Sequence, residues 1–234
     1  MKSRRHFLKT TLLFSPVLAF PKNIFGKTNK RLPNVLILGD SISIGYFPFV
    51  KEIMKEKAMV TRPFSPDSTP ENCEGTTSGV ENIDRWIGDT KWDVIHFNFG
   101  LHDLKNVHTE TGKNSNNPKD PHQANLKQYE ENMTEIVGKL KRTGAKLIFA
   151  TTTPYPDTAI KPMRLPGMPE KYNVVAEKIM KENGVVINDL YTLVLPRMSE
   201  IQLPSNVHFT EPGYEVLGEA VAQKIVECLQ INKN

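Results

Sequence analysis

The chain has 234 residues, of which 38% are hydrophobic and 24% are charged, and this suits one globular domain with a buried core. Its formal net charge is +4, but residues 1–26 contain five basic and no acidic side chains, so the net charge of the remainder is −1. The charge balance therefore does not indicate a nucleic-acid partner. After the first twenty-odd residues, no apolar run is long enough to cross a bilayer.

The N-terminal segment MKSRRHFLKTTLLFSPVLAF begins with basic side chains and becomes mostly apolar from Leu12 to Phe20. This layout is typical of an export signal and is too short for a stable membrane anchor. Ser3–Lys9 also matches the twin-arginine pattern S-R-R-x-F-L-K, although an ordinary secretion signal with two arginines is the alternative. We expect residues 1–26 to be an export signal, residues 27–234 to be a single domain, and the mature protein to be periplasmic or secreted.

After Pro33, strand-like and helix-like segments alternate along the chain. A weak strand is predicted over Met59–Arg62. Stronger strands are predicted over four short apolar runs, which are Val35–Leu38, Val94–Phe99, Lys146–Thr151 and Val185–Asn188. Short apolar strands of this kind indicate a parallel sheet that is buried on both faces.

Apolar residues at three- and four-residue steps predict helices between and after these strands. We expect three such stripes to face the core, with Gly144 and Gly184 near the ends of the first two helices. The alternation predicts an α/β fold, a three-layer sandwich. The stripes are Leu126, Tyr129, Met133, Ile136, Val137 and Leu140; Val174, Val175, Ile179 and Met180; and Val216, Leu217, Ala220, Val221 and Ile225.

Two features lie outside this alternation. Residues 105–123, KNVHTETGKNSNNPKDPHQ, form a long polar connection, which is either a solvated excursion or a lid over a site. Cys73 and Cys228 are the only cysteines and lie 155 positions apart. They could pair in an oxidising compartment, but the apolar helical pattern around Cys228 favours independent thiols.

Polar residues gather where the predicted strands end. In an open parallel sheet, ligands bind outside the carboxyl ends of the strands, so these residues are the candidates for a site. They are Asp40 and Ser41 in LILGDSISIG, Asn72–Gly75, Asn98–Asp103, Thr152–Pro154 and Ser205–Gly213.

Four motifs in this set occur in a family's order: L-G-D-S at 38–41, the glycine block at 72–75, G-L-H-D at 100–103 and V-H-F-T at 207–210. Together they resemble the SGNH, or GDSL, hydrolases over roughly residues 34–229. The resemblance implies a flavodoxin-like sheet of five parallel strands and a serine esterase that needs no cofactor. It also implies that Ser41 is the nucleophile and His208 the general base that takes its proton. The structural alternatives are a helix-capping Ser41 and a histidine that only supports its loop.

The resemblance further implies an oxyanion hole made by the Ser41 N–H, a glycine N–H and a side-chain donor. Gly75 is the expected glycine and Gly79 the alternative. The family's asparagine is replaced here by His102, whose ring N–H can donate if the tautomer is right. Asn98, four residues earlier, is the alternative donor.

The family aspartate three residues before the histidine is replaced by Ser205, and Asn206 beside it is also uncharged. His208 would then be oriented by Ser205, by Asn206 or by a backbone carbonyl. We therefore expect a weaker or differently supported catalyst, with an inactive protein as the alternative. Asp40 and Asp103, although close to the site residues, are expected to fix turns by hydrogen bonding.

No metal site is expected, because the histidines at 96, 102, 108 and 122 lack metal-ligand spacing. The sequence thus predicts an exported serine hydrolase that cleaves carboxylic esters, with O-acyl groups on carbohydrate as the preferred substrate. A non-catalytic glycan or cell-wall binding protein and a sugar O-acyltransferase are the alternatives. The oligomeric state is left open.

Overall fold

Five parallel strands form one sheet in the order β2-β1-β3-β4-β5. This is the flavodoxin-like order, and it confirms the predicted α/β fold class. The computed structural model describes residues 31–230, so the expected export signal lies outside the described residues. The strands are β1 (Asn34–Leu38), β2 (Met59–Thr61), β3 (Val94–Phe97), β4 (Lys146–Ala150) and β5 (Val186–Asn188).

Strand register brings the site segments to one edge of the sheet. Leu38 lies opposite Phe97, and Phe97 lies opposite Phe149, so β1, β3 and β4 end level with one another. The residues that follow these strands therefore emerge side by side at the carboxyl edge.

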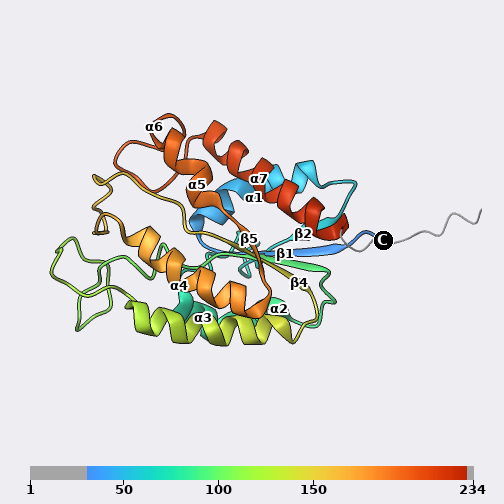
Figure 1. Cartoon of the computed structure of the whole chain (residues 1–234), viewed down its shortest axis with the longest axis horizontal. Helices are drawn as coiled ribbons and strands as arrows, with labels where there is room; N and C mark the ends of the chain where they lie inside the picture. The colour runs from blue at the N-terminus through green and yellow to red at the C-terminus, as the bar shows by residue number, and fades with distance from the viewer. Residues whose placement is uncertain (1–30, 231–234) are drawn as a thin grey trace, which may run out of the picture. The chain divides into compact units, whose positions relative to one another are not determined.

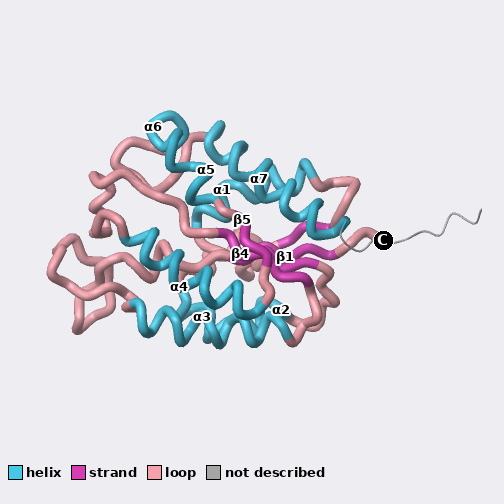
Figure 2. The backbone as a smooth tube through the Cα atoms, viewed as in Figure 1, coloured by secondary structure: helices cyan, strands magenta, loops and turns pink. Residues whose placement is uncertain are grey.

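Helices cover both faces of this sheet, as a three-layer sandwich requires (Figures 1 and 2). On one face α1 packs against α7, and on the other α3 packs against both α2 and α4. The helices are α1 (Ser41–Ile53), α2 (Thr76–Ile87), α3 (Leu126–Lys141), α4 (Met168–Asn183), α5 (Leu190–Val194), the 3-10 helix η1 (Leu195–Arg197), α6 (Met198–Ile201) and α7 (Glu211–Gln230).

The predicted helix stripes face the core except at Val174 of α4 and at Val216 of α7, which is only partly buried. In α3, Tyr129, Met133 and Leu140 are fully buried. Val174 of α4, which we expected to face the core, is 69% exposed. The helix α4 begins at Met168, and its buried face is formed by Tyr172, Ala176, Ile179 and Met180. Val174 does not lie on that face, so its side chain points away from the core.

The polar connection at 105–123 has backbone structure of its own. The main chain of Asn106 pairs with His122, and its buried side chain donates to the carbonyl oxygens of Asn117 and Asp120. The Met163 N–H donates to Ser115 O and ties the segment to the chain before α4. Whether it acts as a lid stays a prediction.

Two further features bear on the predictions. Cys73 and Cys228 are both buried and free, in agreement with independent thiols. Within residues 31–230, no helix combines the length and the apolarity needed to span a bilayer.

Candidate active site

The turn after β1 presents Ser41 at the start of α1. The preceding residue, Asp40, is buried and caps the helix, because its Oδ1 accepts the Ile42 N–H at 2.9 Å. The capping alternative for Ser41 is therefore wrong, since Asp40 fills that role as expected. The Ser41 hydroxyl is left to another partner.

That partner is His208. Its Nε2 lies 2.9 Å from Ser41 Oγ, although the two residues are 167 positions apart. The His208 loop is held by its own ends, because Leu203 N–H donates to His208 O and Thr210 N–H donates to Ile201 O, both at 2.9 Å. Gln202 Nε2 fastens the loop to Pro154 O, beyond the end of β4, at 2.7 Å. The hydroxyl and the imidazole are thus in hydrogen-bond reach for proton transfer.

Asn206 fixes the tautomer of this imidazole. Its Oδ1 accepts the His208 main-chain N–H at 3.0 Å and also lies 2.7 Å from His208 Nδ1. Since the main-chain N–H can only donate, the atom at this position must be the amide oxygen, and Nδ1 must carry a proton to bind it. Nε2 is then the unprotonated nitrogen, which accepts a hydrogen bond from the Ser41 hydroxyl.

Ser205 forms no hydrogen bond with the imidazole. Its Oγ donates to Thr158 Oγ1 at 3.0 Å, and its backbone has a positive φ of 53°. Of the two candidate orienting residues, the structure therefore brings Asn206 to the ring.

The environment of His208 favours its neutral form. Burial lowers the pKa of His208, and the positive charge of Arg164 lowers it further. A neutral imidazole is the form that accepts a proton, so this shift favours the basic form near neutral pH.

The glycine block lies beside the turn after β1, because the Cys73 N–H donates to Gly39 O at 3.2 Å. Gly75 directly precedes Thr76, the first residue of α2. Asp103 Oδ1 accepts hydrogen bonds from the Thr76 N–H, at 2.8 Å, and from the Thr76 hydroxyl. A Cβ at position 75 would lie 3.0 Å from Asp103 Oδ2. Asp103 therefore has the structural role expected of it. Gly79, the alternative, packs against Ile136 on α3.

His102 is mostly buried, and its Nδ1 lies 3.3 Å from the Lys105 ammonium. Burial, together with the charges of Lys105 and Arg164, lowers the pKa of His102 to about 3, so the ring is neutral. Because an ammonium group only donates, Nδ1 accepts and the ring proton is on Nε2. Asn98 uses its side-chain N–H groups on Ala150 O and Thr152 Oγ1 of the neighbouring segment, at 2.7 and 3.4 Å.

Two buried arginines lie close to these residues, and neither belongs to a sequence motif named above. Arg62 donates to Gly39 O and Ser43 Oγ near the turn after β1, and Arg164 donates to Leu101 O. Both charges act on the buried Asp40, whose pKa is nevertheless raised because burial outweighs them. Arg62 directly follows β2, so collecting the polar residues at every strand end would have found it.

No group of three or more potential metal ligands of the His, Cys, Asp and Glu types comes together among the described residues. His96 is buried on β3 beside Asn188, whereas His108 lies 3.3 Å from Asp120 in the polar connection. The four histidines that are close in sequence are thus divided among separate surroundings.

The arrangement agrees with a comparison with known families. The family model of the GDSL-like lipase/acylhydrolase family matches residues 37–216. The chain belongs to this family. The protein is therefore a hydrolase that acts on ester bonds. No curated protein sequence matches it.

Solved structures similar to this GDSL-like chain have the same fold at low identity. A lipase/acylhydrolase from Enterococcus faecalis is 20% identical, with a TM-score of 0.65 over 83% of this chain and 95% of that one. A catalytic mutant of an acetylxylan esterase from Geobacillus stearothermophilus is 16% identical, with a TM-score of 0.63 over 82% and 94%. A carbohydrate esterase family 3 protein from Talaromyces cellulolyticus is 15% identical, with a TM-score of 0.60 over 85% and 99%.

Proposed function

We propose that this protein is a serine esterase in which Ser41 and His208 form the catalytic pair. The contact of 2.9 Å between Ser41 Oγ and His208 Nε2, with Nδ1 held by Asn206, is the observation that carries the proposal. His208 takes the Ser41 proton while Oγ attacks the ester carbonyl. The protonated ring then returns the proton to the leaving alcohol, and water hydrolyses the acyl-enzyme by the same route.

The negative oxygen of the tetrahedral intermediate needs donors that are already in place. We assign this role to the N–H groups of Ser41 and Gly75 and to Nε2–H of His102. The proposal for His102 is supported by Lys105, which holds the proton on the nitrogen that has to donate. Within residues 31–230, neither the Ser41 N–H nor the Gly75 N–H donates to a protein acceptor.

We propose a carbohydrate O-acyl ester as substrate. Support comes from two of the similar structures, which are described as an acetylxylan esterase and a carbohydrate esterase. We further propose that residues 1–26 direct export by the twin-arginine route, so that the enzyme works in the periplasm or outside the cell. Replacing Arg4 and Arg5 together by lysine should trap the precursor, whereas normal export of that variant would contradict the route.

Hydrolysis of p-nitrophenyl acetate tests the catalytic proposal. The wild-type protein should turn over the ester, and Ser41→Ala should abolish turnover above the uncatalysed rate. Equal rates for both proteins would favour the binding-protein alternative, which rests on the absence of the family's triad acid. Adding a sugar acceptor and finding acylated sugar instead of free acid would favour the acyltransferase.

A further inference from the structure

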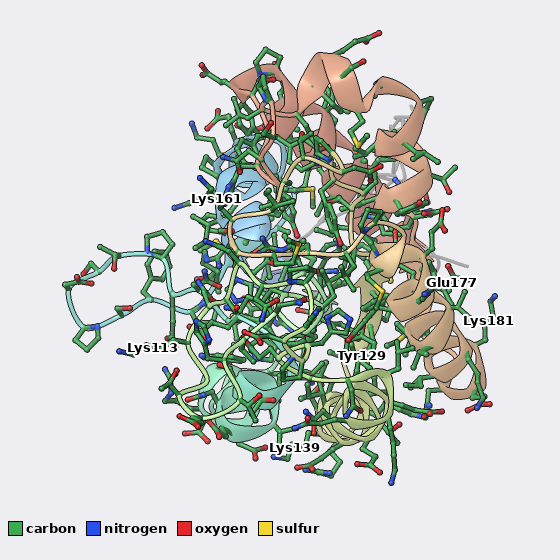
Figure 3. All side chains as sticks on the ribbon, turned by 90° about the vertical axis from the view of Figure 1, so that its left-hand side faces the viewer. Lys113, Tyr129, Lys139, Lys161, Glu177 and Lys181 are labelled. Carbon is green, nitrogen blue, oxygen red and sulfur yellow. The ribbon has the colours of Figure 1, made fainter. Side chains whose placement is uncertain are left out.

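A pocket of about 300 Å³ lies next to the catalytic pair, and its lining contains cations but no carboxylate. Its lining includes Lys161 and Arg164, together with Asn206 and His208 of the loop before α7. Figure 3 views the molecule from the left-hand side of Figure 1, and Lys161 lies on this side with its ammonium group pointing outward. The remaining lining residues are Ala159, Pro162, Ser205 and Val207.

Arg164 is only 6% exposed, and its guanidinium forms no direct ion pair within residues 31–230, although the charge of the buried Asp40 acts on it. Its Nε donates to Leu101 O and its Nη1 to Pro162 O, each at 3.3 Å. Among residues 31–230, its Nη2 donates to no acceptor, and no carboxylate forms an ion pair with the guanidinium. A buried cation that is not directly paired with an anion is costly, and a planar guanidinium suits the two oxygens of a carboxylate or sulfate.

The position of the pocket indicates which part of an ester it receives. In the proposed reaction His208 returns a proton to the leaving alcohol, so the alcohol lies on the His208 side of the scissile bond. The pocket is lined by His208 itself and is large enough for a small-molecule fragment.

We propose that this pocket binds an anionic group, a carboxylate or a sulfate, on the alcohol part of the substrate. Arg164 forms the paired hydrogen bonds and Lys161 adds charge at the rim. The substrate is then an acyl ester of an acidic sugar such as a uronic acid or a sulfated sugar. This inference rests on the proposed esterase function and adds a substrate class to it.

Binding measured without turnover tests the inference. The Ser41→Ala protein is titrated calorimetrically with methyl glucuronoside, with the matching methyl glucoside, and with the glucoside carrying a sulfate. We expect at least one anionic sugar to bind about 10-fold more tightly than the neutral one, as one charge-assisted contact supplies. The difference should shrink as salt is raised. The tighter of the two anions identifies the group.

Variants in the same Ser41→Ala background locate the contact. Arg164→Gln should remove the preference for the anion, while Arg164→Lys and Lys161→Gln should each reduce it. Lys161 is exposed, so Lys161→Gln should fold normally. It therefore still tests the anion preference if replacement of Arg164 prevents folding. Lys113→Gln, an exposed lysine outside the pocket, is the matched control and should leave the preference unchanged.

Equal affinity for all three sugars would overturn the inference, and so would a preference that survives both Arg164→Lys and Lys161→Gln. Because the titration needs no hydrolysis, these results are independent of the esterase assay. Equal affinities beside Ser41-dependent hydrolysis would reject the anion pocket alone, whereas a lack of hydrolysis beside selective binding would reject the enzyme alone.

Discussion

Asn206 Oδ1 accepts two hydrogen bonds from His208, one from the ring Nδ1–H at 2.7 Å and one from the main-chain N–H at 3.0 Å. In the serine-protease triad, asparagine in place of the acid is damaging because the ring takes the wrong tautomer. Here the main-chain N–H orients the amide oxygen toward the ring, so the correct tautomer is kept. What Asn206 lacks is the negative charge that would stabilise the protonated ring.

Replacing Asn206 should therefore have opposite effects depending on the side chain. Asn206→Ala should lower kcat about 10- to 100-fold, because a hydrogen bond to a charged group contributes about 1.5–3 kcal/mol. Asn206→Asp should raise kcat and move the acidic limb of the pH–rate profile to higher pH, since a carboxylate stabilises the imidazolium. Steady-state kinetics on p-nitrophenyl acetate measure both.

Ser205→Asp is the control for this pair, because it restores the family's acid at the expected sequence position. The side chain at 205 faces Thr158, so we expect no comparable gain in kcat. A larger gain from Ser205→Asp than from Asn206→Asp would contradict the assigned orientation of the ring.

The pH dependence of activity should respond to Arg164. Burial and then Arg164 lower the pKa of His208, so we expect the wild-type acidic limb at lower pH than an ordinary imidazole would give. Arg164→Gln removes the positive charge, which should raise the pKa of His208 and shift the limb to higher pH. The kcat/KM profile of a neutral ester checks this, and an unchanged limb would show that burial alone sets the pKa.

The oxyanion donor is tested at His102 and Lys105. His102→Ala should lower kcat about 10²- to 10³-fold, as loss of one oxyanion donor does in other enzymes. Lys105→Met should have a smaller effect in the same direction, because it frees the tautomer without removing the ring. His102→Asn, the family's residue, should retain much of the activity. A His102→Ala protein with wild-type kcat would exclude the ring as a donor.

Asp103 should make stability depend on pH in an unusual direction. Burial raises the pKa of Asp103 to about 7, above its ordinary value of 3.8. The folded state therefore binds the proton more tightly than the unfolded state, and stability from this group falls as pH rises from about 4 to about 7. Asp103→Asn mimics the protonated side chain, so its gain in Tm should be larger at pH 8 than at pH 5. An equal effect at both values would contradict the raised pKa.

Local sequence patterns were sufficient to predict the strands of the sheet and the order of the motifs along the chain. The apolar runs ended within two residues of the observed strands, because a strand buried on both faces leaves little choice of side chain. The carboxyl-edge rule placed Ser41 on the correct side of the sheet, and the family pattern supplied His208 as its partner. The short helices α5 and α6 were missed because five- and four-residue segments contain no periodicity to detect.

The supporting residues of the site could not be read from sequence in the same way. Which of Ser205 and Asn206 contacts the ring depends on the loop backbone, where Ser205 adopts a positive φ that its residue type does not indicate. Arg164 lies in an irregular segment with no motif, and its importance follows only from its burial and from the absence of a direct ion pair within residues 31–230. Such features depend on tertiary structure and become visible only when distant segments are placed together.

The central claim is that Ser41 is a nucleophile activated by His208, and covalent labelling tests it most directly. The protein is treated with diethyl p-nitrophenyl phosphate, which phosphorylates activated serines, and the modified peptide is identified by mass spectrometry. We predict one diethylphosphoryl group on Ser41, released p-nitrophenol in equal amount, and no labelling of His208→Ala. Labelling at another residue, or equal labelling of the wild-type and His208→Ala proteins, would contradict the account.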